Sequence, residues 1–125
     1  MDLIESHFQK LQAQYPEATL SRRPDGSALV VIPNFLLPSG WSSQQTSILF
    51  VVPVGYPAAR PDCFWADAGL RLSSGGQPSN TSVNANYGGA EQRLWFSFHP
   101  GSWHPTLDDL VTYTKLIKSR FERRQ

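Results

Sequence analysis

Two proline motifs, far apart in the chain, constrain the fold more than any other feature of this sequence. Residues 55–62 read Gly-Tyr-Pro-Ala-Ala-Arg-Pro-Asp and follow an apolar run, whereas Trp103-His104-Pro105 precedes an amphipathic segment. Proline fixes φ and lacks a backbone N–H, so Pro57 and Pro61 predict an extended loop that ends the preceding strand. Tyr56 is expected to turn from this loop back onto the core. The simpler interpretation of the same residues is a stiff turn with no further role.

Length and charge narrow the class of protein. The chain has 125 residues and a formal net charge of +1 at pH 7. A chain of this length is expected to form a single domain, residues 1–125, that buries roughly two-thirds of its unfolded surface. Because positive and negative charges nearly balance, a nucleic-acid partner is not expected.

Cys63 is the only cysteine, so an internal disulfide and a zinc site made of cysteines alone are both excluded. This cysteine usage favours a reducing compartment. The first 14 residues carry Asp2, Glu5 and Lys10 among apolar residues, unlike a secretory signal, and no apolar run reaches membrane-spanning length. We therefore expect a cytoplasmic protein with no membrane partner.

Helical periodicity is found near both ends of the chain. Near the N-terminus, where Pro16 ends the pattern, the apolar residues at helical spacing are Leu3, Ile4, Phe8 and Leu11. Near the C-terminus, Thr106 is predicted as the N-cap of a second helix, with Asp108 and Asp109 in its first turn. The apolar stripe predicted for that helix consists of Leu107, Leu110, Thr114, Ile117 and Phe121.

Between the helices the sequence predicts an antiparallel sheet. Residues 19–23 and 28–32 are expected to form a hairpin around Pro24-Asp25-Gly26, since Gly26 tolerates positive φ. The apolar run 48–52 predicts a central strand that is buried on both faces. Shorter strands are predicted at 63–65, 70–72 and 94–99.

Two segments are predicted to be irregular. Residues 34–45 are interrupted by Pro38 and Gly40, but they are expected to pack through the apolar anchors Phe35, Leu36, Leu37 and Trp41. Residues 73–91 are rich in Ser, Gly, Asn and Gln and predict a long polar loop insertion. A loop of this length in a small domain is either a surface for a partner or disordered, and the sequence does not decide between the two.

The order of these features resembles the ubiquitin-conjugating enzyme family, in particular its divergent bacterial branch, which is often found beside ubiquitin-like proteins and their activating enzymes. The resemblance covers most of the chain and is carried by Tyr56, Pro57, Pro61, Trp103 and Pro105. It implies an α+β fold, in which an N-terminal helix precedes an antiparallel meander sheet and a C-terminal crossover helix closes the core. It also implies two partners, a ubiquitin-activating-like enzyme and a ubiquitin-like protein. No cofactor is expected, because Gly75-Gly76 and Gly88-Gly89 lack the following lysine and the strand-to-helix context of a phosphate-binding loop.

The resemblance implies a position for the catalytic cysteine, which in this family carries the ubiquitin-like protein as a thioester. Counting back from Trp103 by the family's usual spacing reaches Trp95 or a residue close to it, and no thiol is found there. Cys63 lies too early, beside Phe64 and Trp65, where the family usually has an apolar core residue. A buried thiol behaves as a small hydrophobe. The standard nucleophile is therefore predicted to be missing.

Other polar residues offer weaker hypotheses. The family's His-Pro-Asn triplet is not present in its expected form, which leaves Asn80 as a speculative oxyanion donor. A hydrolase triad is a third possibility, although sequence spacing cannot establish one. The side chains considered for it are Ser97, Ser102, His99, His104, Asp108 and Asp109. The two histidines with Asp108 lack the spacing of a zinc motif, so no metal site is expected.

Two functions stay open, and with them the question of whether the protein is an enzyme. In the first, the domain docks an activating enzyme or a ubiquitin-like protein without holding a thioester. The resemblance nominates the N-terminal helix and the 34–45 loop for this contact, through Leu3, Ile4, Phe8, Leu11, Phe35, Leu36 and Trp41. In the alternative, an active transferase carries the ubiquitin-like protein on Cys63, although apolar neighbours raise a thiol pKa.

Overall fold

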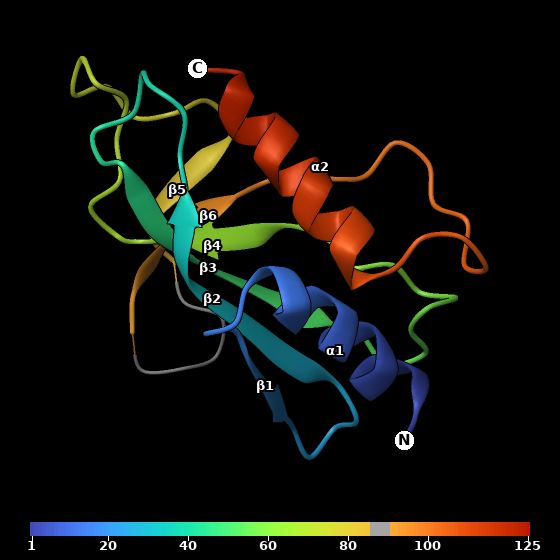
Figure 1. Cartoon of the computed structure of the whole chain (residues 1–125). Coiled ribbons are helices and arrows are strands. Elements are labelled where there is room, and N and C mark those ends of the chain that lie inside the picture. The colour runs from blue at the N-terminus through green and yellow to red at the C-terminus, as the bar shows by residue number, and fades with distance from the viewer. Residues whose placement is uncertain (86–90) are drawn as a thin grey trace.

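Two helices cover one face of a six-stranded antiparallel sheet in the computed structural model, which describes residues 1–85 and 91–125 (Figure 1). The strand order is β1-β2-β3-β4-β6-β5, and every neighbouring pair is antiparallel. The elements in chain order are α1 (Leu3–Gln14), β1 (Thr19–Arg22), β2 (Ala28–Leu36), β3 (Gln45–Val52), β4 (Phe64–Ala66), β5 (Thr81–Ala85), β6 (Arg93–Phe96) and α2 (Leu110–Glu122). The predicted α+β arrangement, with a helix before the meander and a helix after it, is confirmed.

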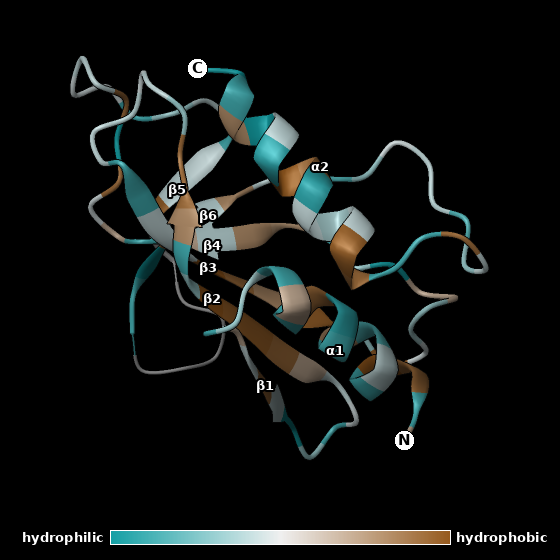
Figure 2. Ribbon diagram, viewed as in Figure 1, coloured by the Kyte–Doolittle hydropathy of each residue, from teal (hydrophilic) through white to brown (hydrophobic). Residues whose placement is uncertain are grey.

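The first half of the sheet follows the predicted pattern. Strands β1 and β2 form the expected hairpin, in which Gly26 has φ +93° and the Asp25 carboxylate accepts the Ser27 N–H at 2.9 Å. Strand β3 lies at the centre of the core, where Ile48, Leu49 and Phe50 are at most 1% exposed. Figure 2 shows strongly hydrophobic stretches on the strands that run behind α1. The central strand predicted at 48–52 is therefore confirmed.

Helix α2 begins later than the sequence predicted. Asp109, not Thr106, is the N-cap: its carboxylate accepts the backbone N–H of Thr112 at 3.1 Å, and the Thr112 hydroxyl accepts the Asp109 N–H in return. The residues before it form a separate turn, because the Asp108 carboxylate accepts the backbone N–H of His104. Leu107 belongs to that turn and is 78% exposed, so its predicted place in the buried stripe was wrong.

Several irregular segments also differ from expectation. Strand β5 lies inside the segment 73–91 that was expected to be a polar loop, and residues 86–90 of that segment lie outside the described residues. Strand β2 extends into the segment 34–45, and the rest of that segment packs through Trp41, which is 6% exposed. The strand predicted at 70–72 is reduced to an isolated bridge between Leu72 and Trp41.

Helix α2 is held to the sheet by an aromatic cluster around Phe121. Its ring centroid lies 5.1 Å from that of Trp41, 5.3 Å from that of Phe96 and 5.6 Å from that of Phe64. Trp41 also donates its indole N–H to the Phe121 carbonyl at 2.8 Å. Within the described residues, neither helix has the length and apolar character needed to cross a bilayer.

We expect Phe121→Ala to lower the free energy of unfolding by about 3–5 kcal/mol, because Phe121 is fully buried and its removal leaves a cavity beside the rings of Phe35, Trp41, Phe64 and Phe96. Lys118→Ala, at an exposed position of the same helix, should change stability by no more than about 0.5 kcal/mol. Urea denaturation followed by circular dichroism measures both. Equal stability of the two variants would contradict the assignment of the core.

Candidate functional site

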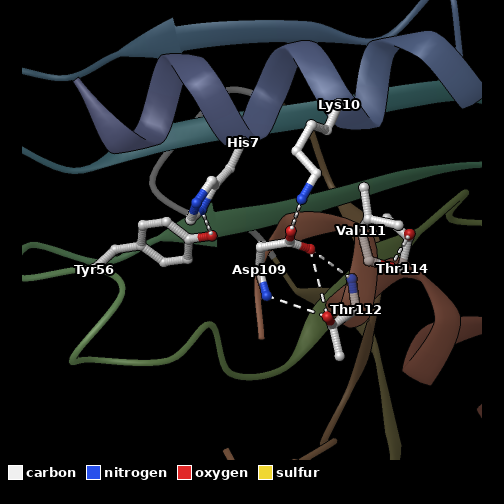
Figure 3. A network of polar contacts seen from close by, with 7 residues as sticks. All are labelled: His7, Lys10, Tyr56, Asp109, Val111, Thr112 and Thr114. Carbon is white, nitrogen blue, oxygen red and sulfur yellow. Dashed lines mark hydrogen bonds and ion pairs between the residues drawn. The ribbon is translucent and has the colours of Figure 1, made fainter. Parts of the chain in front are cut away.

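The structure brings the two proline motifs into contact. Trp103 donates its indole N–H to the carbonyl of Pro57 at 2.8 Å, and its ring centroid lies 6.4 Å from that of Tyr56. Tyr56 is 8% exposed and its hydroxyl is 2.6 Å from Nδ1 of His7 on α1 (Figure 3). Burial strongly raises the pKa of the Tyr56 hydroxyl, so it is neutral at physiological pH. The Tyr-Pro loop, the Trp-x-Pro corner and α1 thus form one connected structure.

A second polar contact joins the two helices beside this corner. Lys10 of α1 donates to Asp109 at 2.7 Å, while the other Asp109 oxygen accepts the Thr112 N–H (Figure 3). Burial on its own would raise the pKa of the Asp109 carboxyl, but the hydrogen bonds from Lys10 and Thr112 outweigh it and hold that pKa below its usual value. The N-cap of α2 is therefore a carboxylate that also fixes the position of α1.

A groove of about 560 Å³ lies next to these contacts, between α1, the Tyr-Pro loop and the turn before α2. Two exposed leucines stand on its rim, Leu3 from α1 at 54% exposure and Leu107 from the turn before α2 at 78%. Exposed apolar side chains around a hollow are one feature of surfaces that contact another protein. The groove is lined by Leu3, His7, Lys10, Gly55, Pro57, Ala58, Pro105, Thr106, Leu107, Asp108 and Asp109.

A different group of polar residues converges at the ends of three neighbouring strands. Strand β6 lies between β4 and β5 and is antiparallel to both, so its C-terminal end meets the N-terminal ends of its neighbours. Asp62 and Cys63 precede β4, Asn80 precedes β5, and Ser97 and His99 follow β6. The Ser97 N–H donates to the Asn80 carbonyl at 2.8 Å, and the Cys63 N–H donates to the Phe98 carbonyl at 2.7 Å.

Within this group, three side chains form a hydrogen-bonded chain. Nδ1 of His99 is 2.7 Å from a carboxylate oxygen of Asp62, and Nε2 of the same ring is 3.4 Å from the Ser97 hydroxyl. The His99 and Asp62 side chains are 57% and 48% exposed, so solvent reaches the chain. The carboxylate-imidazole-hydroxyl order is the arrangement in which a histidine can activate a serine.

Cys63 lies beside the same histidine but in a less favourable setting. Its sulfur, a ring nitrogen of His99 and an oxygen of Asp62 all lie within 4.8 Å of one another. Burial of the half-buried thiol raises its pKa, and the nearby charge of Asp62 raises it further. The thiol is therefore mostly protonated at neutral pH. Its backbone is held firmly, since the Tyr113 hydroxyl donates to the Cys63 carbonyl at 2.5 Å.

The same three side chains offer the ligand types that zinc accepts, namely a thiolate, an imidazole and a carboxylate. The short contact between Asp62 and Nδ1 of His99 works against this use, because it engages Nδ1 and one carboxylate oxygen in a hydrogen bond. A metal would have to bind Nε2, which faces Ser97. We therefore interpret the cluster through its hydrogen bonds.

The structure separates the residues that the sequence nominated for binding. Leu3 and Leu36 are exposed, at 54% and 73%, and are available to a partner. Ile4 is partly buried and packs against the core. The remaining four have their side chains in the core and cannot offer a direct contact surface: Phe8, Leu11, Phe35 and Trp41. Of the four residues nominated on α1, Leu3 alone is therefore exposed.

The structure also sorts the residues considered for a triad. His99 and Ser97 come together, but the acid beside them is Asp62, which the sequence analysis did not include. Asp108 and Asp109 are used instead by the turn before α2 and by its N-cap. The sequence signal that could have found Asp62 was its position directly before the strand predicted at 63–65, which the structure pairs with β6.

Comparison with known proteins identifies one family. A family model described as prokaryotic E2 family E matches residues 6–124. No curated protein and no solved structure matches the chain.

Stability should depend on the Asp109 carboxylate. Because its pKa is lower in the folded than in the unfolded state, its contribution is complete above the unfolded value of about 3.9 and is lost as the pH falls through the folded value. We expect Asp109→Ala to cost about 1–2 kcal/mol at pH 7. Asp109→Asn keeps a capping oxygen, so it should cost less, and it should lose acid sensitivity between about pH 5 and pH 2. Denaturation at a series of pH values tests this, and an unchanged pH profile in Asp109→Asn would contradict it.

Proposed function

This chain belongs to prokaryotic E2 family E, and on that premise we propose that it docks an activating enzyme and a ubiquitin-like protein in a bacterial conjugation system. The family match makes it a ubiquitin-conjugating-like protein. The proposed role extends this to docking through the groove between α1, the Tyr-Pro loop and the turn before α2. We further propose that the domain lacks the standard thioester cysteine.

The observation that carries the docking proposal is the apolar rim of the groove. Leu3 and Leu107 are large and more than half exposed, although the domain has a complete core into which apolar side chains could pack. They stand over a rigid base, because Trp103 is bonded to Pro57 and Lys10 to Asp109. A preformed surface with apolar anchors binds a partner without a large cost of ordering.

The environment of Cys63 supports the absence of a standard thioester. Trp95 stands at or next to the position where the resemblance places the cysteine, and it is a half-buried residue of β6 paired with Trp65. Cys63 itself has a raised pKa and a carboxylate next to it, both of which reduce the thiolate fraction. A domain with this cysteine is better suited to bind partners than to carry cargo on sulfur.

A second candidate function is transfer through Cys63. The observation in its favour is the His99 imidazole within 4.8 Å of the sulfur, since an imidazole can accept the thiol proton. In this reading Cys63 is the carrier and Asp62 orients the histidine. The two candidates differ in whether a thioester forms.

Docking predicts that Leu107→Asp and Leu3→Asp each weaken binding to the activating enzyme from the same genome by at least about tenfold, or roughly 1.4 kcal/mol. Isothermal titration calorimetry without ATP measures this binding and involves no chemistry. Val83→Asp, an exposed apolar position on β5 at the edge of the sheet, is the matched control and should leave the affinity unchanged. Wild-type affinity in both leucine variants would contradict docking through the groove.

Transfer through Cys63 is tested with the activating enzyme, the ubiquitin-like protein and ATP. Our proposal predicts no covalent adduct that reducing agents cleave, in the wild type or in Cys63→Ala, as seen on gels run with and without a thiol. An adduct of the wild type that a thiol removes and that Cys63→Ala loses would replace our proposal with the second candidate.

A further inference from the structure

We propose that Ser97 is an acyl acceptor, with His99 as its general base and Asp62 as the residue that positions His99. This inference deepens the proposed function, on which it rests for the identity of the acyl group. The ubiquitin-like protein would be held as an oxygen ester on Ser97 and not as a thioester on a cysteine.

The first support is the order of the three groups. Asp62 contacts Nδ1 of His99 at 2.7 Å, so that nitrogen carries the proton and donates it to the carboxylate. In the neutral ring the other nitrogen, Nε2, is then the acceptor, and it lies 3.4 Å from the Ser97 hydroxyl. This distance is long for a hydrogen bond, as is common in a catalytic pair before its substrate binds.

The second support is the way the backbone fixes these side chains. Ser97 and His99 are two residues apart in an extended segment, where alternate side chains point to the same side. Ser97 is held by its N–H bond to Asn80. A second contact fixes residues 97–100, since Arg60 donates to the Pro100 carbonyl at 2.5 Å.

The third support is the contrast between Ser97 and Cys63. A cysteine nucleophile works as a thiolate, and both burial and Asp62 oppose the thiolate of Cys63. A serine needs no ionised ground state, because a neighbouring base removes its proton during the attack. Asp62, which hinders the cysteine, helps the serine by stabilising the imidazolium that forms.

The step balances without an oxidant or reductant. The Ser97 oxygen attacks the carbonyl carbon of the thioester that joins the ubiquitin-like protein to a cysteine of the activating enzyme. The new C–O bond forms, the C–S bond breaks, and Nε2 of His99 takes the hydroxyl proton and passes it to the departing sulfur. The products are an ester on Ser97 and a free thiol on the activating enzyme.

Asn80 is the neighbouring residue whose side chain could assist this step. Its carbonyl accepts the Ser97 N–H, so the two residues are adjacent across β5 and β6, and Asn80 is exposed. A carboxamide beside the attacked carbon can donate a hydrogen bond to the oxyanion that develops there.

The experiment uses phenyl thioacetate, a small activated thioester, so that chemistry is tested without a protein partner. Intact-mass spectrometry of the full chain should show one added acetyl group that survives a thiol reductant and is removed by hydroxylamine. Ser97→Ala should lose this acetylation, and His99→Gln should slow it at least about 100-fold. Ser102→Ala, an exposed serine on the same connection, is the matched control and should react like the wild type.

Three further variants separate a chemical role from a structural one. Ser97→Cys should convert the acetyl adduct to one that a thiol cleaves, which a misfolded protein could not do. Asp62→Asn should slow acetylation and change its pH profile, and Asp62→Glu should restore part of the rate, because only a carboxylate stabilises the imidazolium.

The inference is overturned if the wild type is not acetylated, if acetylation persists in Ser97→Ala, or if the adduct is cleaved by thiols and lost in Cys63→Ala. None of these outcomes bears on docking, since Ser97→Ala should bind the activating enzyme as the wild type does in the calorimetric assay. Loss of binding in Leu107→Asp with normal acetylation would in turn leave the serine chemistry intact.

Discussion

The antiparallel pairing of β6 with both of its neighbours is the constraint from which the polar site follows. Because β4 and β5 run opposite to β6, the segments that precede β4 and β5 must meet the segment that follows β6 at the same end of these three strands. The core side of the same strands fixes the arrangement, since Phe64 of β4 and Phe96 of β6 stack with their ring centroids 4.6 Å apart. Tyr113 of α2 then bonds the Cys63 carbonyl from the helix layer. The site is thus a consequence of how the core packs.

The sequence was sufficient to predict most of the fold because its strongest signals are local. Helical periodicity located α1, the Pro-Asp-Gly turn located the first hairpin, and the apolar run at 48–52 located the central strand. The start of α2 was predicted too early because Thr106 is also a good N-cap residue. Asp109 caps the helix through its reciprocal hydrogen bonds with Thr112, and it also binds Lys10, which lies 99 positions earlier in the chain and could not be paired with it from the sequence.

The candidate site was harder to predict because its parts come from three separate segments. Ser97 and His99 were considered only among six side chains for a triad, and the acids of that set are used by the turn and cap before α2. The acid that contacts His99 is 37 residues away, and only the pairing of β4 with β6 brings it there. In the same way, periodicity could nominate Phe8 and Leu11 but could not distinguish a core contact from a partner contact.

The backbone conformations at Cys63 and Asn80 have an evolutionary consequence. Both residues have left-handed φ values, 60° and 57°, and each stands directly before a strand that leads away from the site. Glycine and asparagine adopt this conformation readily, whereas β-branched residues are strained in it. Drift at these two positions should therefore favour glycine or small polar residues over valine, isoleucine or threonine. Cysteine at 63 can then be understood as a small residue that tolerates the bend, whether or not its sulfur ever reacts.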